Sequence, residues 1–308
     1  MKIGGFNFEN SLFLAPMAGV TDFAFRSLAR EFGADLSFSE MISAKGLVYN
    51  SEKTKNMLFC LKNENPSAVQ FFGNDPQVFE KAIKMPEVEK FDIVDINFGC
   101  PAPKIFNNGE GSALLNDYKK MQEIVIASKK ATTKPVGAKI RLGIDKIDFD
   151  VCKALQEAGV DYITVHGRTK VQGYSGKANY DAIAKIKSLV SVPVIGNGDV
   201  EDKESFDKMK QTGVDGVMIG RGSLGRPWVF AEILEKDISI SPYDVIEKHI
   251  SLLREKFNDD FLCKYLRKHL LWYLKGYSAN ELKIKVCKLQ DLDEILKEFK
   301  NFFDKANY

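Results

Sequence analysis

Short apolar or β-branched runs alternate with longer amphipathic segments over the first two-thirds of the chain. Runs of this length, each followed by a polar or glycine-rich loop, are typical of strands buried in a parallel sheet. Eight strands are predicted, at residues 12–15, 36–38, 68–72, 93–96, 136–140, 162–165, 193–195 and 216–219. Between them, apolar spacing of helical period predicts helices at residues 23–32, 76–85, 118–131, 149–158, 180–190 and 203–212.

The order of these segments indicates the fold class. Gly33, Gly159 and Gly213 follow three of the predicted helices, where glycine commonly forms the C-terminal cap. Eight strand–helix units without a long antiparallel meander predict an α/β fold, a (β/α)8 TIM barrel, over residues 1–235. A doubly wound sheet is the alternative, but six strands would fit it better than eight.

The alternation stops after the eighth strand. Residues 236–242 are expected to form a linker, and residues 243–308 show helical spacing alone, which predicts a small all-helical domain. Within residues 261–290 one acidic residue accompanies seven basic residues, Lys264, Arg267, Lys268, Lys275, Lys283, Lys285 and Lys288. Four aromatic residues are interleaved with them, Tyr265, Trp272, Tyr273 and Tyr277. This pattern fits a solvated helix face with a tryptophan in the core, and it equally fits a surface that binds phosphates and stacks on unpaired bases.

Composition narrows the class of protein further. The 308 residues carry a net charge of +2, so a nucleic-acid partner would need a local basic face. The five cysteines are widely spaced and lack a C-x-x-C pair, which argues against disulfides, zinc and iron–sulfur sites and for a reducing compartment. The N-terminus lacks an apolar leader, and no apolar stretch is long enough to span a membrane. We therefore expect a cytoplasmic monomer with no metal and no membrane partner.

The segment Phe91–Leu115, FDIVDINFGCPAPKIFNNGEGSALL, contains the first candidate for chemistry. Its buried strand is followed by Gly99, Cys100 and Pro101, and glycine beside proline favours a tight turn. The turn presents the thiol just past the C-terminal end of the strand, where barrel enzymes keep their reactive groups. A lone cysteine is more often a small buried hydrophobe, so the other strand ends must decide between the two interpretations.

The ends of the eight strands share one mouth of a barrel. Residues 139 and 141, like residues 166 and 168, are two positions apart and therefore lie on the same side of their strand. Together the ends gather amides, a thiol, an imidazole and several cations, which random surface loops rarely do. The candidate residues are Pro16, Met17, Ala18, Glu40, Gln70, Asn97, Cys100, Lys139, Arg141, His166, Arg168, Asn197, Gly198, Asp199, Gly220 and Arg221.

Strands seven and eight end in glycine-rich turns, which form the usual phosphate site of a barrel. Arg221 with Gly198 and Gly222 suits that role, so a phosphate-bearing cofactor is expected. The chain lacks a G-x-G-x-x-G after the first strand and a Walker lysine motif, which argues against Rossmann and P-loop sites. FMN fits instead, with its ring facing Gln70, Lys139 and His166, and with Lys139 stabilising negative charge on the reduced ring.

Eight motifs connect the whole chain with a known family. The sequence resembles the tRNA-dihydrouridine synthases, FMN-dependent enzymes that reduce the C5–C6 double bond of uridines in the D-loop of tRNA, and it is most similar to their bacterial B-type branch. The motifs are APMAGVTD (15–22), AVQFFGNDP (68–76), DINFGCPAPK (95–104), GSALL (111–115), KIRLG (139–143), HGRTKVQGYSGKA (166–178), IGNGDV (195–200) and MIGRGSLGRPW (218–228). In this family a helical domain that helps to grip tRNA follows the barrel, so the resemblance implies a tRNA-binding domain at residues 243–308.

The resemblance also implies residue roles. It implies FMN contacts at Pro16, Met17, Ala18, Gln70, Lys139, His166, Asn197, Gly198, Asp199, Gly220 and Arg221, and it makes Cys100 the proton donor. A hydride from NADPH or NADH would reach C6 of the uracil by way of FMN, after which C5 needs a proton. A thiol with an ordinary pKa of ~8.5 is protonated at neutral pH and can supply it. Asn97, Arg141 and Arg168 are the candidates for binding the substrate.

Two other functions stay open. The first is a flavin barrel dehydrogenase acting on a free pyrimidine, of the dihydroorotate or dihydropyrimidine type, although such a substrate needs no basic helical domain. The second is a non-catalytic tRNA-binding protein, which the joint presence of Cys100, Lys139 and His166 argues against. The chain departs from the family pattern at Phe106–Asn108, where relatives often carry more basic residues. Its C-terminal segment is also less motif-like than the barrel, so the target uridine does not follow from the sequence.

Overall fold

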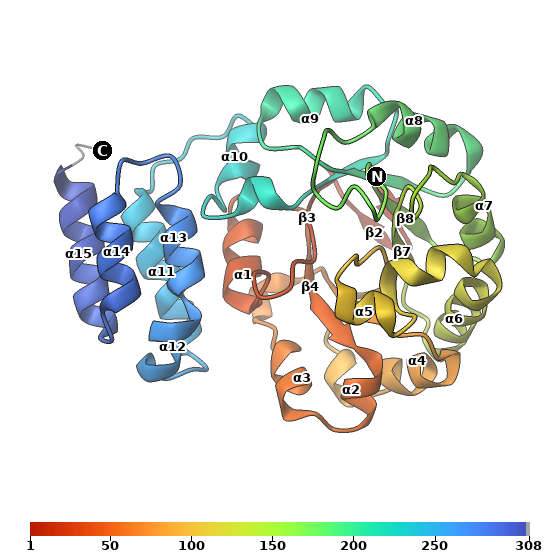
Figure 1. The fold of residues 1–308 in the computed structure, drawn as a ribbon, viewed down its shortest axis with the longest axis horizontal. Coiled ribbons are helices and arrows are strands. Elements are labelled where there is room, and N and C mark those ends of the chain that lie inside the picture. The colour runs from red at the N-terminus through yellow and green to blue at the C-terminus, as the bar shows by residue number, and fades with distance from the viewer. Residues whose placement is uncertain (306–308) are drawn as a thin grey trace.

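Eight parallel strands close into a barrel, which confirms the predicted (β/α)8 fold (Figure 1). The computed structural model describes residues 1–305, so the last three residues of the predicted helical domain lie outside the described residues. The strand order around the barrel is β10-β3-β4-β5-β6-β7-β8-β9. The bounds are β3 Leu12–Leu14, β4 Leu36–Ser43, β5 Ser67–Phe72, β6 Ile93–Phe98, β7 Val136–Arg141, β8 Tyr162–His166, β9 Val194–Asn197 and β10 Gly216–Ile219.

Six helices follow the strands at the predicted places and cover the outside of the barrel (Figure 1). They are α1 Phe23–Glu31, α4 Pro76–Ile83, α6 Tyr118–Ala131, α7 Asp150–Glu157, α8 Tyr180–Leu189 and α9 Lys203–Lys210. The predicted cap residues Gly33, Gly159 and Gly213 have φ values of +104°, +90° and +82°. These left-handed conformations favour glycine and end the preceding helices.

Several short helices lie in the loops and were not predicted. They are α2 Ala44–Val48, α3 Glu52–Met57, α5 Pro103–Asn107 and α10 Val229–Ile233, with 3-10 turns η1 Lys62–Glu64, η2 Pro86–Val88, η3 Gly111–Asn116 and η4 Arg221–Ser223. Each α-helix in this group has five or six residues. Fewer than two turns cannot show a helical repeat of apolar positions, so the sequence pattern does not reveal them.

Strand β4 is longer than the predicted strand at residues 36–38. It continues to Ser43, and its pairing with β5 shifts register between Phe38 and Met41. Ser39 lies inside this irregularity and is fully buried, as is Ser37. Buried serines interrupt the apolar run by which a core strand is recognised, so the prediction stopped too early.

A small hairpin, β1 (Lys2–Ile3) with β2 (Phe6–Asn7), precedes the barrel. Ile3 and Phe8 pack with Phe13 and Met218 in an apolar cluster inside the barrel. The Met1 ammonium donates to the hydroxyl of Ser11, directly before β3, at 2.6 Å, so the hairpin lies where the strands begin, at the end of the barrel opposite to the mouth. It was not predicted, since strands of two residues carry no readable alternation.

Five helices follow the barrel and lie beside it at α1 (Figure 1). They are α11 Pro242–Arg254, α12 Asp259–Tyr265, α13 Arg267–Tyr273, α14 Asn280–Lys288 and α15 Leu292–Lys305. Residues 234–241 form neither helix nor strand, in the region where the linker was expected. The helices share an apolar core that also includes Phe23, Ala24 and Leu28 of α1. In the described part of the chain, we find no helix with the length and apolar character needed to cross a membrane.

Candidate active site

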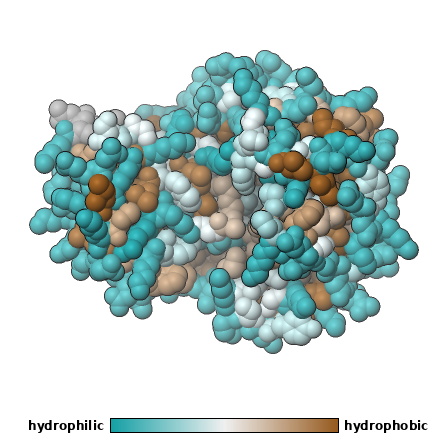
Figure 2. Space-filling model, viewed as in Figure 1, coloured by the Kyte–Doolittle hydropathy of each residue, from teal (hydrophilic) through white to brown (hydrophobic). Residues whose placement is uncertain are grey.

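A cavity of about 1430 Å³ opens where the barrel strands end. Its wall includes residues at the C-terminal ends of β6, β7, β8 and β9 and in the turns after β3, β6, β8, β9 and β10. The structure brings fourteen of the fifteen cofactor, catalytic and substrate candidates to this one wall, namely Pro16, Met17, Ala18, Asn97, Cys100, Lys139, Arg141, His166, Arg168, Asn197, Gly198, Asp199, Gly220 and Arg221. Figure 2 shows the surface hollowed between the C-terminal helices and the barrel, with pale and brown side chains in the hollow.

Cys100 is held in place by Asn97, the residue before the end of β6. The Asn97 Oδ1 accepts the backbone N–H groups of Gly99 at 3.1 Å and of Cys100 at 2.8 Å. The Ser112 hydroxyl donates to the Cys100 carbonyl at 2.8 Å. The thiol residue is 7% exposed, and burial raises its pKa. The Cys100 thiol is therefore protonated at neutral pH and lies in a fixed turn at the mouth.

Gln70 is the candidate that the cavity wall does not include. It is fully buried in β5, where its Oε1 accepts from Asn97 Nδ2 at 2.9 Å and its Nε2 donates to Asp95 at 2.6 Å. Burial raises the pKa of Asp95 to about 6, against the hydrogen bonds from Gln70 and Tyr162. Gln70 thus orients Asn97, and through Asn97 the turn that carries Cys100.

Beside the thiol, the cavity is lined by Lys139, His166 and Asn197. The Lys139 ammonium donates to Asn197 Oδ1 at 3.1 Å, and Asn197 Nδ2 donates to the Met218 carbonyl at 2.8 Å. Burial, reinforced by Arg141, lowers the pKa of Lys139 to about 8. Burial and the surrounding cations, Lys139 first, lower the pKa of His166 to about 2. The imidazole is therefore neutral, while the lysine keeps its charge at neutral pH.

Two arginines predicted to bind substrate brace the loop after β8. Arg141 is 3% exposed and donates to the carbonyls of Gly99, Thr169 and Gly173 at 2.9, 3.0 and 2.8 Å. This joins the turn of Cys100 to the loop after β8. Arg168 is 2% exposed and donates to the carbonyls of residues 175 and 176 and to the Asp199 carboxylate. Both side chains line the cavity, and each is already held by several protein acceptors.

The turns after β9 and β10 form a glycine-lined corner of the cavity. Gly198 has a φ of +128°, and a Cβ there would lie 2.8 Å from the Ala178 Cβ. At Gly220 a Cβ would lie 3.7 Å from both Ala15 Cβ and Met17 Sδ, so a side chain would project along the wall. Arg221 donates to Asp199 at 3.0 Å and lies over the Tyr174 ring, 4.7 Å from its centroid. Backbone N–H groups beside an exposed guanidinium suit a phosphate.

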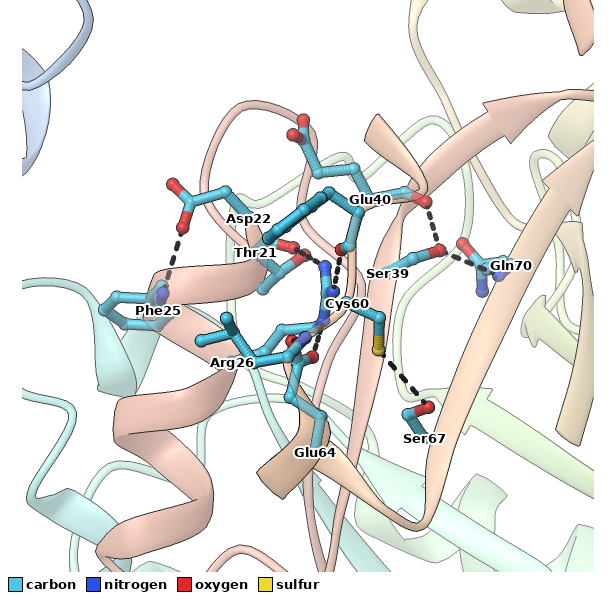
Figure 3. A network of polar contacts seen from close by, with 12 residues as sticks. Thr21, Asp22, Phe25, Arg26, Ser39, Glu40, Cys60, Glu64, Ser67 and Gln70 are labelled. Carbon is cyan, nitrogen blue, oxygen red and sulfur yellow. Dashed lines mark hydrogen bonds and ion pairs between the residues drawn. The ribbon is translucent and has the colours of Figure 1, made fainter. Parts of the chain in front are cut away.

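The turn after β3 is fixed by a buried ion pair (Figure 3). The Arg26 guanidinium in α1 donates to Glu64 at 2.6 Å, to the Thr21 carbonyl at 3.0 Å and to the Phe59 carbonyl at 2.7 Å. The Thr21 hydroxyl in turn accepts the N–H of Met17 at 3.0 Å. Arg26 therefore determines where the Met17 turn lies on the cavity wall.

Glu40, also a candidate, supports the same turn from β4. Its carboxylate accepts the N–H of Gly19, and burial raises its pKa. Figure 3 shows Glu40 beside Ser39, whose hydroxyl donates to the Glu40 carbonyl and accepts the N–H of Gln70. Glu40 is not part of the cavity wall, so it lies behind the turn rather than in the site.

Sequence reasoning missed several residues of the wall. Met41 of β4, Tyr174 of the loop after β8, and Trp272 and Lys275 of the C-terminal helices all line the cavity. Tyr174 lies inside the motif at residues 166–178 and could have been selected from it. Trp272 and Lys275 were named only as members of the basic segment, because no local pattern tells which face of a later helix turns toward the barrel.

Fold and site together define a class of protein. A closed parallel barrel whose mouth gathers a thiol, a neutral imidazole and several cations is an enzyme with its site at the usual face. The family described as Dihydrouridine synthase (Dus) matches residues 13–307. The chain therefore belongs to the dihydrouridine synthase family, and it is an oxidoreductase.

Individual relatives agree with this assignment. The tRNA-dihydrouridine synthase B of Pseudomonas aeruginosa is 37% identical over 317 residues, covering 98% of this chain and 96% of its own. The protein of the same name from Pasteurella multocida is 39% identical over 293 residues, covering 91% and 88%.

Solved structures show the same fold at low sequence identity. DHODH from Eimeria tenella, in complex with ferulenol, is 14% identical with a TM-score of 0.58, covering 76% of this chain and 82% of its own. Morphinone reductase is 12% identical with a TM-score of 0.57, covering 77% and 89%. These likenesses support the barrel architecture.

Proposed function

We propose that this chain is a tRNA-dihydrouridine synthase that uses FMN and NADPH or NADH to reduce uridines in the D-loop of tRNA. Near full-length similarity to proteins with that name supports the substrate. The observation that carries the proposal is the buried, protonated Cys100 thiol held beside Lys139 at the barrel mouth.

The residues of the cavity fit FMN. The glycine-lined corner at Gly198 and Gly220, with Arg221, would hold the phosphate. Lys139, His166 and Asn197 would hold the polar edge of the ring, with the turn of Pro16, Met17 and Ala18 as a further wall, while Gln70 acts through Asn97. Asp199 keeps Arg221 oriented by its ion pair. When bound, FMN supplies hydride chemistry, from reduced nicotinamide to C6 of the uracil.

Cys100 would act as the general acid. Reduction at C6 leaves negative charge toward C5 and O4 of the uracil, and C5 must then gain a proton. The raised pKa keeps the thiol protonated, and Asn97 fixes its turn through two backbone hydrogen bonds. The Lys139 ammonium in the same cavity would stabilise the developing negative charge.

The substrate would reach this site as an extruded base, since the cavity lies at a barrel mouth. Asn97, Arg141 and Arg168 would face its uracil edge. We assign the barrel to residues 1–235, the linker to residues 236–242, and the tRNA-binding helical domain to residues 243–308.

Nucleoside mass spectrometry on unmodified tRNA, incubated with the protein, FMN and NADPH, tests the proposal. We expect dihydrouridine from the wild type, a large loss in Cys100→Ala, and full activity in Cys287→Ala, which removes an exposed thiol. Undiminished product in Cys100→Ala would contradict the acid role. Product from a free pyrimidine but none from tRNA would favour a dehydrogenase, and a protein that binds no flavin would favour a non-catalytic tRNA-binding protein.

A further inference from the structure

The C-terminal helices contribute two side chains to the cavity wall, Trp272 at the end of α13 and Lys275 just after it. The remaining lining residues come from the barrel. Trp272 is partly buried and also packs against the barrel core. The site is therefore closed on one side by a part of the chain that lies more than forty residues beyond the last strand, since β10 ends at Ile219.

The position of α13 at the mouth is firmly set. Gly225 approaches α13 so closely that a Cβ there would lie 2.2 Å from the carbonyl carbon of Trp272. The Tyr265 hydroxyl donates to Asp22 at 2.8 Å, just after the turn that carries Met17. Contact of backbone with backbone leaves no room for another chain between α13 and the barrel. The Trp272 ring thus has a defined place beside the site.

The other rings of the basic segment do not line the cavity. Tyr273 is buried, with its hydroxyl 3.1 Å from His249 Nδ1. Tyr265 bonds Asp22, and Tyr277 packs on Phe302 and Phe303. Of the four rings that could have stacked on unpaired bases, Trp272 is the one that lines the cavity.

The cavity has room for a second planar group. Pockets for single ligands usually measure about 300–1,000 Å³. The volume of about 1430 Å³ exceeds that range, so one cofactor of ordinary size would not fill the cavity that Trp272 lines. The Lys275 side chain is exposed at the rim, close enough to the same cavity to meet a phosphate.

We propose that Trp272 and Lys275 position the nucleotide that enters the site, the indole by stacking on a base and the ammonium by pairing with an adjacent phosphate. Aromatic stacking tolerates any base, and a lysine reads only the backbone. This pair would therefore hold the strand without selecting its sequence. The inference rests on the proposed function, because it takes tRNA as the substrate.

Tryptophan fluorescence gives a test independent of turnover. The chain has two tryptophans, and Trp228 stacks on Tyr273 rather than lining the cavity. In Trp228→Phe holoenzyme, where Trp272 is the single indole, added tRNA should quench the emission. In Trp272→Phe the emission of Trp228 should change little. Binding of tRNA without quenching in Trp228→Phe would overturn the stacking role.

Kinetics and salt dependence test the pair separately. Trp272→Ala should lower kcat/KM for tRNA roughly ten- to a hundredfold, with partial recovery in Trp272→Phe. Reduction of the bound flavin by NADPH should keep its rate, which also shows that the barrel is folded. Lys275→Ala should reduce the slope of log affinity against log salt by roughly 0.7–0.9, the contribution of one phosphate contact.

The matched control for charge is Lys2→Ala, since Lys2 is exposed on the hairpin at the opposite end of the barrel. It should leave the slope unchanged. Unchanged kcat/KM in Trp272→Ala, or a Lys275→Ala slope equal to that of Lys2→Ala, would overturn the corresponding role. A wild-type enzyme that makes no dihydrouridine would instead contradict the proposed function itself.

Discussion

Burial raises the pKa of Cys100 and lowers the pKa of Lys139, so both side chains are driven toward their neutral forms in one cavity. For the thiol the neutral form is the proton donor. For the lysine, the neutral form lacks the positive charge with which the side chain stabilises the reaction. The two shifts therefore have opposite consequences as the pH rises.

The first prediction concerns this difference. Because the pKa of Lys139 is lowered to about 8, its charge is present below pH 8 and lost above it, and kcat/KM should fall along an alkaline limb near pH 8. The raised pKa of Cys100 places loss of its proton at higher pH. Lys139→Arg keeps a cation and should move the limb upward, as a pH profile will measure. A limb that stays in place in Lys139→Arg would instead identify Cys100 as the titrating group.

A second prediction follows from the bonds that Asn97 makes. Asn97→Ala leaves the N–H groups of Gly99 and Cys100 without their acceptor, and each buried unpaired group costs about 1–3 kcal/mol. We expect a fall in dihydrouridine formation of roughly ten- to a hundredfold, since the acid remains present but loses its fixed position. The matched control is Asn74→Ala, which removes one exposed bond to the Asn108 carbonyl. Equal activities of the two variants would contradict the positioning role.

At the scale of elements, the contact between the loop that follows η4 and α13 depends on one glycine. Gly225 has a φ of +66° and faces the backbone of Trp272, whereas Gly276 has a φ of +90° with nothing near its missing Cβ. Both positions strain an L-residue, but Gly225 alone of this pair also faces a steric barrier. Comparing alanine substitutions at these two positions therefore separates the cost of backbone strain from the cost of a steric clash.

Gly225→Ala should therefore lower the free energy of unfolding by more than Gly276→Ala does. Gly276→Ala should cost about 1–2 kcal/mol for its left-handed backbone alone. Gly225→Ala must in addition move α13, which should weaken tRNA binding through Trp272. Urea denaturation and tRNA binding measure the two effects. Equal losses of stability in the two variants would show that α13 can shift without lowering the free energy of unfolding.

The buried pair of Arg26 and Glu64 leads to a further prediction for α1. Removing one partner, as in Arg26→Met, leaves a buried carboxylate unpaired and should cost about 3–5 kcal/mol. The double variant Arg26→Met with Glu64→Leu should recover a large part of that loss. Urea denaturation of the three proteins measures the coupling. A double variant less stable than Arg26→Met would mean that the remaining bonds of Glu64, such as that from the Leu61 N–H, matter more than the ion pair.

The elements differ in how well the sequence predicts them. The barrel helices, each of eight or more residues, were predicted closely, as for α6 at Tyr118–Ala131. β4 was cut short because Ser39 is polar yet buried. In the site, strand ends predicted the wall well because the barrel fixes their direction. Gln70 was predicted to face the cofactor, but its amide bonds Asn97, a contact that depends on side-chain geometry rather than on spacing.

For the whole molecule, buried histidines connect stability with pH. Burial lowers the pKa of His269 to about 3, from 6.5 in the unfolded chain. His269 is therefore harder to protonate in the folded chain than in the unfolded chain. Its contribution to the free energy of unfolding is fully present above pH 6.5 and is lost as the pH falls toward 3. Each such group changes the free energy of unfolding by up to about 1.4 kcal/mol per pH unit.

The last prediction is that His269→Gln loses less stability in acid than the wild type does. The slopes of the free energy of unfolding against pH should differ by about one bound proton. Denaturation between pH 6.5 and 4 measures the difference. Comparing the two proteins cancels the contributions of other groups, such as Asp95. Parallel curves for the two proteins would mean that His269 is protonated in the folded state, with Asp22 as its counter-ion at 3.8 Å.

Helix α1 belongs to two cores, since Phe25 and Ala29 pack in the barrel while Phe23, Ala24 and Leu28 pack with the C-terminal helices. The two parts of the chain are therefore not interchangeable modules. An enzyme assembled from the barrel of one relative and the C-terminal helices of another would need α1 to match both. Variation in the residues of α1 should consequently follow variation in the helices it touches, even where the barrel chemistry stays the same.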